Sequence, residues 1–139
     1  MEPIIIERTF AVPVEKLWNA ITDKGEMDQW YFRIDNFRPE PGSRFSFEGG
    51  DDKQTFLHLC RVVEVIPQKK LSHTWAYEGQ DEETLVSFDL SGEGNNSRLK
   101  LTHEGLEKIA KYGPAFAAEN FREGWTMIIG TMLKNYLEK

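Results

Sequence analysis

Two histidines are the clearest candidates for acid–base chemistry in this sequence. His73 and His103 each fall in a segment of alternating residues, on the parity of its apolar positions, so both rings are expected to point inward. Histidine titrates near neutral pH, so such a ring can anchor a ligand in a pH-dependent way. It can equally be a structural residue whose nitrogens bond within the protein. The sequence leaves both interpretations open.

Partners that would complete a catalytic or metal site do not accompany these histidines. No Gly-x-Ser-x-Gly segment occurs, Cys60 has no partner at a recognisable spacing, and the histidines lack the spacing of metal ligands. Arg8 shares the apolar face of the first predicted strand and, beside His103, could hold a ligand carboxylate or carbonyl. We therefore assign no catalytic residue, no metal and no cofactor, and lean towards a protein that is not an enzyme.

Charge and composition exclude several partners. The 139 residues carry 17 Lys and Arg against 23 Asp and Glu, a net charge of −6. Nucleic acids and anionic membranes are bound through excess basic side chains, so we expect neither as a partner. The single cysteine and the absence of a long apolar N-terminal run predict a cytoplasmic protein without membrane insertion. We expect one domain over residues 1–139, as a monomer or homodimer.

The pattern predicts an α+β domain. A strand over about 3–12 precedes a short helix with apolar residues at helical spacing and a second short helix that begins near Asp23. Strands then dominate to residue 104, separated by turns at 39–42, 49–52, 67–70 and 92–96. In the longest of these strands the apolar parity changes near Cys60, which predicts a β-bulge there, with Leu57 and Leu59 on one face.

A long amphipathic helix is predicted at the C-terminus, with Pro114 in its first turn. Its apolar stripe, at offsets 0, 4, 7, 8, 11, 12 and 15, consists of Phe121, Trp125, Ile128, Ile129, Met132, Leu133 and Tyr136. Such a stripe needs a long concave surface, which a strongly twisted sheet of about seven strands provides. Gly124 lies inside this helix, where it predicts close approach to the sheet and overpacking by any larger residue.

The order of several short segments resembles a known family. These segments are Arg8-Thr9-Phe10 with Pro13, Leu17-Trp18-Asn19-Ala20, Ile21-Thr22-Asp23, Trp30, Val65-Ile66-Pro67, Leu71 with Thr74-Trp75, Ser97 to Leu106, and Gly124-Trp125. They resemble proteins related to the C-terminal domain of the Hsp90 ATPase activator, within the superfamily of START domains, birch-pollen-allergen-like proteins and polyketide cyclases. The resemblance implies a helix-grip fold: a curved seven-stranded antiparallel sheet around the C-terminal helix, with two small helices after the first strand.

A helix laid across a curved sheet can enclose a cavity, and large apolar pockets are where small ligands bind. The residues expected to line it are Trp30, Phe45, Phe47, Leu57, His73, Trp75, Tyr77, Phe88, His103, Phe121, Trp125, Ile128 and Met132. The preferred hypothesis is a protein that binds a small hydrophobic or aromatic molecule. A module that contacts a chaperone of the Hsp90 type, and an enzyme of the polyketide cyclase or dehydratase kind, are the alternatives that the resemblance implies.

Overall fold

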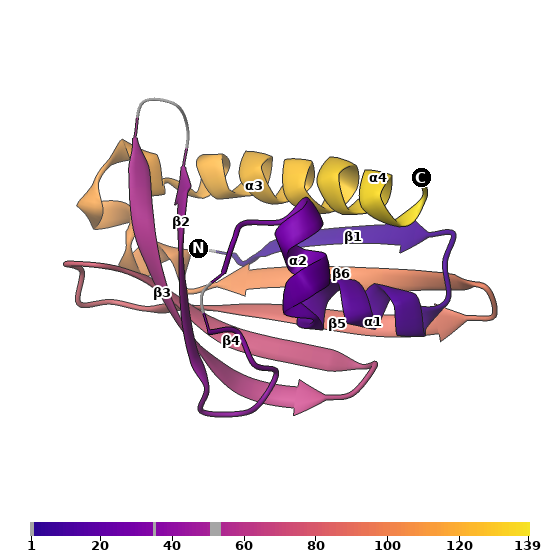
Figure 1. The fold of residues 1–139 in the computed structure, drawn as a ribbon. Coiled ribbons are helices and arrows are strands. Elements are labelled where there is room, and N and C mark those ends of the chain that lie inside the picture. The colour runs from indigo at the N-terminus through magenta and orange to yellow at the C-terminus, as the bar shows by residue number, and fades with distance from the viewer. Residues whose placement is uncertain (1, 35, 51–53) are drawn as a thin grey trace.

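One antiparallel sheet and one long helix dominate the molecule (Figure 1). The structure is a computed structural model that describes residues 2–34, 36–50 and 54–139. Its strands lie in the order β1-β6-β5-β4-β3-β2. Their bounds are Ile4–Phe10 for β1, Arg44–Gly50 for β2, Thr55–Ile66 for β3, Lys70–Tyr77 for β4, Thr84–Glu93 for β5 and Asn96–Glu104 for β6.

The predicted helix-grip architecture is confirmed, but the described residues form six strands instead of seven. The difference lies in residues 31–43, which connect the second helix to β2 without a strand in their described part. Pro39 and Pro41 lack the N–H that a ladder needs, and Ile34 and Phe37 are buried as side chains of an irregular segment. The turn predicted at 49–52 is also changed, because Gly49 and Gly50 end β2; Asp51 and Asp52 lie outside the described residues.

Strand β3 carries the predicted bulge, slightly later than expected. Its register against β4 shifts by one residue between Val62 and Glu64. Up to Val62, the inward positions are therefore those of His58 and Cys60, both buried, whereas Leu59 is 41% exposed. The expected inward parity of Leu57 and Leu59 is wrong, because a bulge reverses the faces only of the residues beyond it.

Two short helices pack beside the long one (Figure 1). Helix α1 spans Val14–Thr22 and α2 spans Lys24–Trp30. The Asp23 carboxylate accepts the backbone N–H of Glu26 at 3.0 Å, which confirms the predicted helix start. The indole N–H of Trp30 donates to the Ala20 carbonyl at 2.8 Å, so a buried hydrogen bond holds the two helices together.

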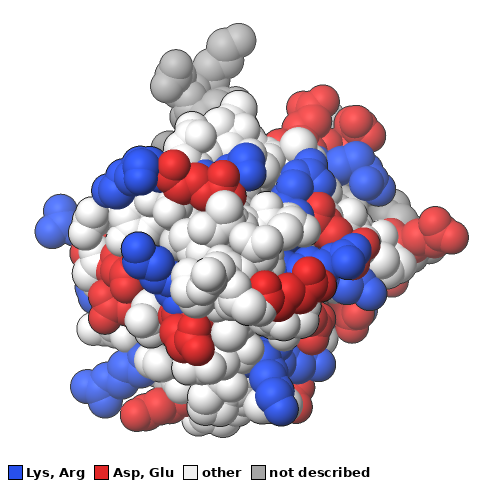
Figure 2. Space-filling model, turned by 90° about the vertical axis from the view of Figure 1, so that its right-hand side faces the viewer, with Lys and Arg blue, Asp and Glu red and all other residues white. Residues whose placement is uncertain are grey.

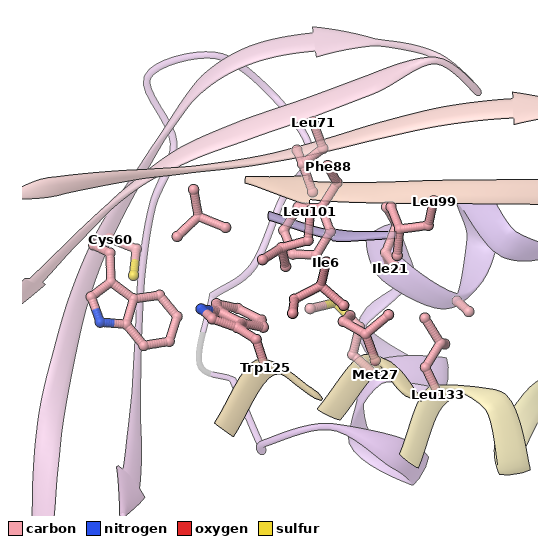
Figure 3. Close-up of a cluster of buried hydrophobic side chains, with 14 of the residues drawn as sticks. Ile6, Ile21, Met27, Cys60, Leu71, Phe88, Leu99, Leu101, Trp125 and Leu133 are labelled. Atoms are coloured by element: carbon pink, nitrogen blue, oxygen red, sulfur yellow. The ribbon is translucent and has the colours of Figure 1, made fainter. Parts of the chain in front are cut away.

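The C-terminal helix is continuous but changes its winding. Helix α3 (Ala118–Met127) passes into a π-helical segment (Ile128–Leu133) and then into α4 (Lys134–Leu137). Pro114 lies in a separate 3₁₀ turn, Pro114–Phe116, and extended backbone at Ala117 divides that turn from α3, so its expected place in the helix is wrong. Figure 3 shows Trp125 and Leu133 of this helix pointing towards Phe88, Leu99 and Leu101 of the sheet.

Candidate functional site

A pocket of about 510 Å³ lies between the ends of β2, β3 and β4 and the N-terminal half of α3. Half of its lining residues carry aromatic rings: Phe32, Phe56, His58, Trp75, Tyr77, Phe116, Phe121 and Trp125. The remaining lining residues are Gly49, Gly50, Gln54, Ala115, Asn120, Glu123, Gly124 and Ile128. Exposed residues such as Glu123 border the opening, and the buried Trp75 and Trp125 form the inner wall.

The structure divides the residues that the sequence predicted for this site. Those that line the pocket are Trp75, Tyr77, Phe121, Trp125 and Ile128. Four others line a much smaller void of about 20 Å³ that also touches Trp125: Trp30, Phe45, His73 and Phe88. Because Trp125 borders both spaces, its indole is the partition between an open pocket and a nearly filled interior.

The other four predicted residues lie outside both spaces. Phe47 and His103 are buried in the packed core, and Met132 is half-buried against it. Leu57 lines a separate surface hollow instead of the pocket, since the bulge in β3 comes too late to turn it inward. The alternation of inward and outward residues therefore identified the aromatic interior. It could not distinguish residues that line the pocket from residues that are packed in the core.

His103 belongs to a chain of buried hydrogen bonds whose direction is fixed by an indole. An indole N–H can only donate, so His103 Nδ1 accepts from Trp125 Nε1 at 3.0 Å. The proton of the neutral ring is then on Nε2, which donates to Thr84 Oγ1 at 2.7 Å. Thr84 in turn donates to the Trp75 carbonyl at 3.1 Å. His103 thus orients the Trp125 indole directly and reaches the backbone of Trp75 through Thr84, and neither of its nitrogens is free for a ligand.

Burial keeps the histidines neutral. Desolvation lowers the pKa of His103 to about 3, with a smaller contribution from His73. The same cause lowers the pKa of His73 to about 4, although its Nδ1 donates to the Thr74 carbonyl at 2.8 Å. A neutral imidazole in the interior supplies hydrogen bonds and ring contacts, and not charge.

His58 is one of the pocket residues that sequence reasoning missed; Phe32, Phe56 and Phe116 are further aromatic ones. His58 stacks on Phe47 with ring centroids 4.4 Å apart, and its Nδ1 donates to the Phe56 carbonyl at 2.9 Å. Desolvation lowers its pKa to about 4 against the opposing effect of backbone carbonyls. The alternation of Phe56, His58, Cys60 and Val62 was the available signal, and it was hidden by the alternative parity of Leu57 and Leu59.

The expected pairing of Arg8 with His103 does not form. In the β1–β6 register Ile4 lies opposite His103, and Arg8 lies opposite Leu99. The Arg8 guanidinium donates to the Glu7 carbonyl at 2.7 Å and lies against the long helix at Gly130. Arg8 therefore takes no part in the pocket.

The close contact expected at Gly124 occurs instead at Gly130. A Cβ added at Gly124 would meet no atom within 4 Å, and Gly124 lines the pocket, so the predicted close approach to the sheet is wrong there. At Gly130 a Cβ would lie 3.3 Å from Arg8 Nε. The close contact therefore occurs in the π-helical segment, and Gly124 leaves space for whatever occupies the pocket.

Formal charge is scarce at the pocket. Among the described lining residues Glu123 is the one acidic side chain, and none is Lys or Arg. In the described parts of the chain no group of three or more His, Cys, Asp and Glu side chains is placed to hold a metal ion. Elsewhere both signs of charge alternate, as on the face in Figure 2.

The family follows from comparison with known proteins. A family model described as "Activator of Hsp90 ATPase homolog 1-like protein" matches residues 11–138. The chain belongs to this family. No curated protein matches it. Among the residues described, no helix of this family member is both long and apolar enough to cross a membrane.

Solved structures share the fold of this family member. Protein MLL2253 from Mesorhizobium loti is 28% identical with a TM-score of 0.78, and the match covers 99% of this chain and 97% of that one. Protein CV1439 from Chromobacterium violaceum is 18% identical with a TM-score of 0.82, over 99% and 98%. DynU16, from the dynemicin biosynthetic locus, is 21% identical with a TM-score of 0.79; the match covers all of this chain but only 48% of DynU16.

Proposed function

We propose that this protein binds a small hydrophobic or aromatic molecule in the pocket between α3 and the ends of β2, β3 and β4. The observation that carries the proposal is the lining of this space of about 510 Å³, in which the buried Trp75 and Trp125 form the inner wall. Two other hollows, of about 620 and 550 Å³, have fewer aromatic side chains in their walls. Aromatic side chains that line an open pocket leave apolar surface in contact with water, which a bound ligand can cover. The size of the pocket falls in the range of about 300–1,000 Å³ that is typical of ligand sites.

The walls favour a flat, apolar ligand. Phe56, Tyr77 and Phe116 meet edge to face, with centroids 4.8–5.8 Å apart. The ring centroids of Trp75 and Trp125 lie 5.4 Å apart on the inner side. The Trp75 indole donates to the Tyr77 hydroxyl, and the Trp125 indole donates to His103. Rings fixed in this way offer contact area to a ligand without losing much conformational entropy on binding.

Gly124 provides the test. A Cβ at this position meets no atom within 4 Å and borders the pocket. We therefore expect Gly124→Phe to fold and its ring to occupy pocket space, which should weaken binding of uncharged naphthalene derivatives at least about tenfold. Quenching of the intrinsic fluorescence of Trp75 and Trp125 measures the affinity. Thr126→Phe is the matched control, because it adds the same ring to an exposed position of α3 outside the lining.

Two results would overturn the proposal. In the first, no naphthalene derivative binds the native chain. In the second, Gly124→Phe binds them as tightly as Thr126→Phe does. The second result would direct attention to the outer surface, which is where a chaperone-contact module would act.

A further inference from the structure

The hydrogen bonds beneath the pocket leave one donor unused. The Trp75 indole N–H donates to the Tyr77 hydroxyl oxygen at 2.9 Å. Because an indole only donates, the hydroxyl proton of Tyr77 must point elsewhere. No acceptor for it occurs among the described residues. Tyr77 is 5% exposed and lines the pocket, so this proton belongs to a nearly buried donor at the pocket wall.

A buried donor without a partner is costly. In the open pocket this donor can turn to water, and a ligand that displaces the water must offer an oxygen in its place to avoid leaving the donor unsatisfied. The Tyr77 ring contacts Phe116 and His58 with centroids 4.8 and 4.7 Å away, so it sits among the residues that a ligand would touch. The hydroxyl is therefore a point of orientation in an otherwise apolar space.

The charges of the pocket restrict the ligand further. A buried carboxylate or phosphate needs a cationic partner to offset its desolvation. The described lining residues provide no Lys or Arg, and their one formal charge is the carboxylate of Glu123. The His58 imidazole adds no positive charge at neutral pH, since its desolvation lowers its pKa to about 4. From the described lining residues, an anionic ligand would thus meet repulsion by Glu123 and no basic side chain to offset it.

We propose that the ligand of this pocket is an uncharged aromatic molecule whose carbonyl or ether oxygen accepts the hydroxyl proton of Tyr77. This inference rests on the proposed function and narrows it to one ligand chemistry. It selects against fatty acids, aromatic acids and phosphate esters of the same size. Tyr77 would orient the oxygen, and the rings of Phe56, Phe116 and Phe121 would cover the apolar skeleton.

Three probes with one ring system test the inference: naphthalene, 2-acetylnaphthalene and 2-naphthoate at neutral pH. We expect the ketone to bind about fivefold more tightly than naphthalene, because one net hydrogen bond is gained. It should bind at least about tenfold more tightly than the carboxylate. In Tyr77→Phe the advantage of the ketone over naphthalene should disappear while naphthalene affinity is kept.

A second measurement uses the native chain, so that the inference can be tested even if the Tyr77→Phe variant does not fold. The infrared carbonyl band of bound 2-acetylnaphthalene should move to lower frequency than in an apolar solvent, since it accepts a hydrogen bond. Equal affinity of ketone and naphthalene, or an unshifted band, overturns the role of Tyr77. Naphthoate that binds as well as the ketone overturns the restriction to uncharged ligands but leaves the proposed function intact. If none of the three binds, the proposed function fails as well.

Discussion

His58, His73 and His103 all lie in the interior, with at most 6% of each side chain exposed. A charged imidazole would lose its hydration there, so each ring stays neutral well below the usual pKa of histidine. Their hydrogen bonds are adapted to that state, as the acceptor role of His103 Nδ1 towards Trp125 shows. At this scale the histidines serve as neutral structural groups: His58 and His73 make ring contacts with Trp75, and His103 accepts the hydrogen bond of the Trp125 indole.

These neutral histidines predict sensitivity to acid. Their folded-state pKa values of about 3 to 4 lie below the unfolded value, so the unfolded chain takes up protons first as the pH falls. The stabilisation that the neutral histidines contribute is fully present above the pKa of histidine in the unfolded chain. It is lost progressively as the pH falls below that value. Between pH 7 and pH 5 each histidine should lower the free energy of unfolding by about 2 kcal/mol. Urea unfolding at a series of pH values measures the loss.

His58→Phe is the control for this prediction. A phenyl ring can keep the stacking on Phe47 but binds no proton, so the variant should lose stability less steeply over the same pH range. The slope of the free energy of unfolding against pH should differ between the native chain and the variant by an amount that approaches the uptake of one proton on unfolding. An unchanged slope would mean that His58 titrates alike in the folded and unfolded chains, contrary to its burial.

The long helix shows how position within an element decides what a glycine does. Gly124 and Gly130 are six residues apart, yet one borders an open pocket and the other touches Arg8 of β1. The π-helical segment begins between them, at Ile128, and changes which residues of the helix face the sheet. The buried row is Trp125, Ile129, Leu133 and Leu137.

Leucine at the two glycines should have opposite effects. Gly124→Leu gains helix propensity without a clash, so the free energy of unfolding should stay the same or rise by up to about 1 kcal/mol. Gly130→Leu crowds the Arg8 guanidinium and should lower it by about 1–3 kcal/mol. Thermal unfolding of both variants measures the difference. Combining Gly130→Leu with Arg8→Ala should recover part of the loss; a strictly additive double variant would show that Arg8 is not the obstacle.

At the scale of the whole molecule, the helix is fixed at one end and borders the pocket at the other. Near its C-terminal end Glu138 Oε2 accepts the Ala11 N–H and the Tyr136 hydroxyl donates to Glu26 Oε1, each at 3.0 Å. Residues of α3 and of the start of β3 line the pocket together. Ligand binding should therefore reduce the mobility of the helix most at the end that borders the pocket.

Hydrogen exchange tests this asymmetry. With saturating 2-acetylnaphthalene, amides in 116–128 and 54–58 should exchange more slowly, because binding to the native state suppresses local opening there. Amides in 129–137 should change little, since their protection already comes from the core. Mass spectrometry of peptides from the two halves of the helix makes the comparison. Equal slowing along the entire helix would contradict a pocket confined to its N-terminal half.

Much of the fold was determined by local sequence patterns. The spacing of Trp125, Ile129 and Leu133 predicts the long helix, because a 3.6-residue period leaves one stripe that must be buried. Asp23 marks the start of α2 through a contact of only three residues. These features depend on neighbours along the chain, so a single sequence is enough to predict them.

Only the tertiary structure decided which inward residues line a pocket and which fill the core. The inward position of His58 depends on a bulge placed by pairing with β4, and the space at Gly124 depends on how the helix docks on the sheet. Both are set by contacts between residues far apart in the sequence. Periodicity can say that a side chain is buried, but the volume left beside it is a property of all the elements that meet there.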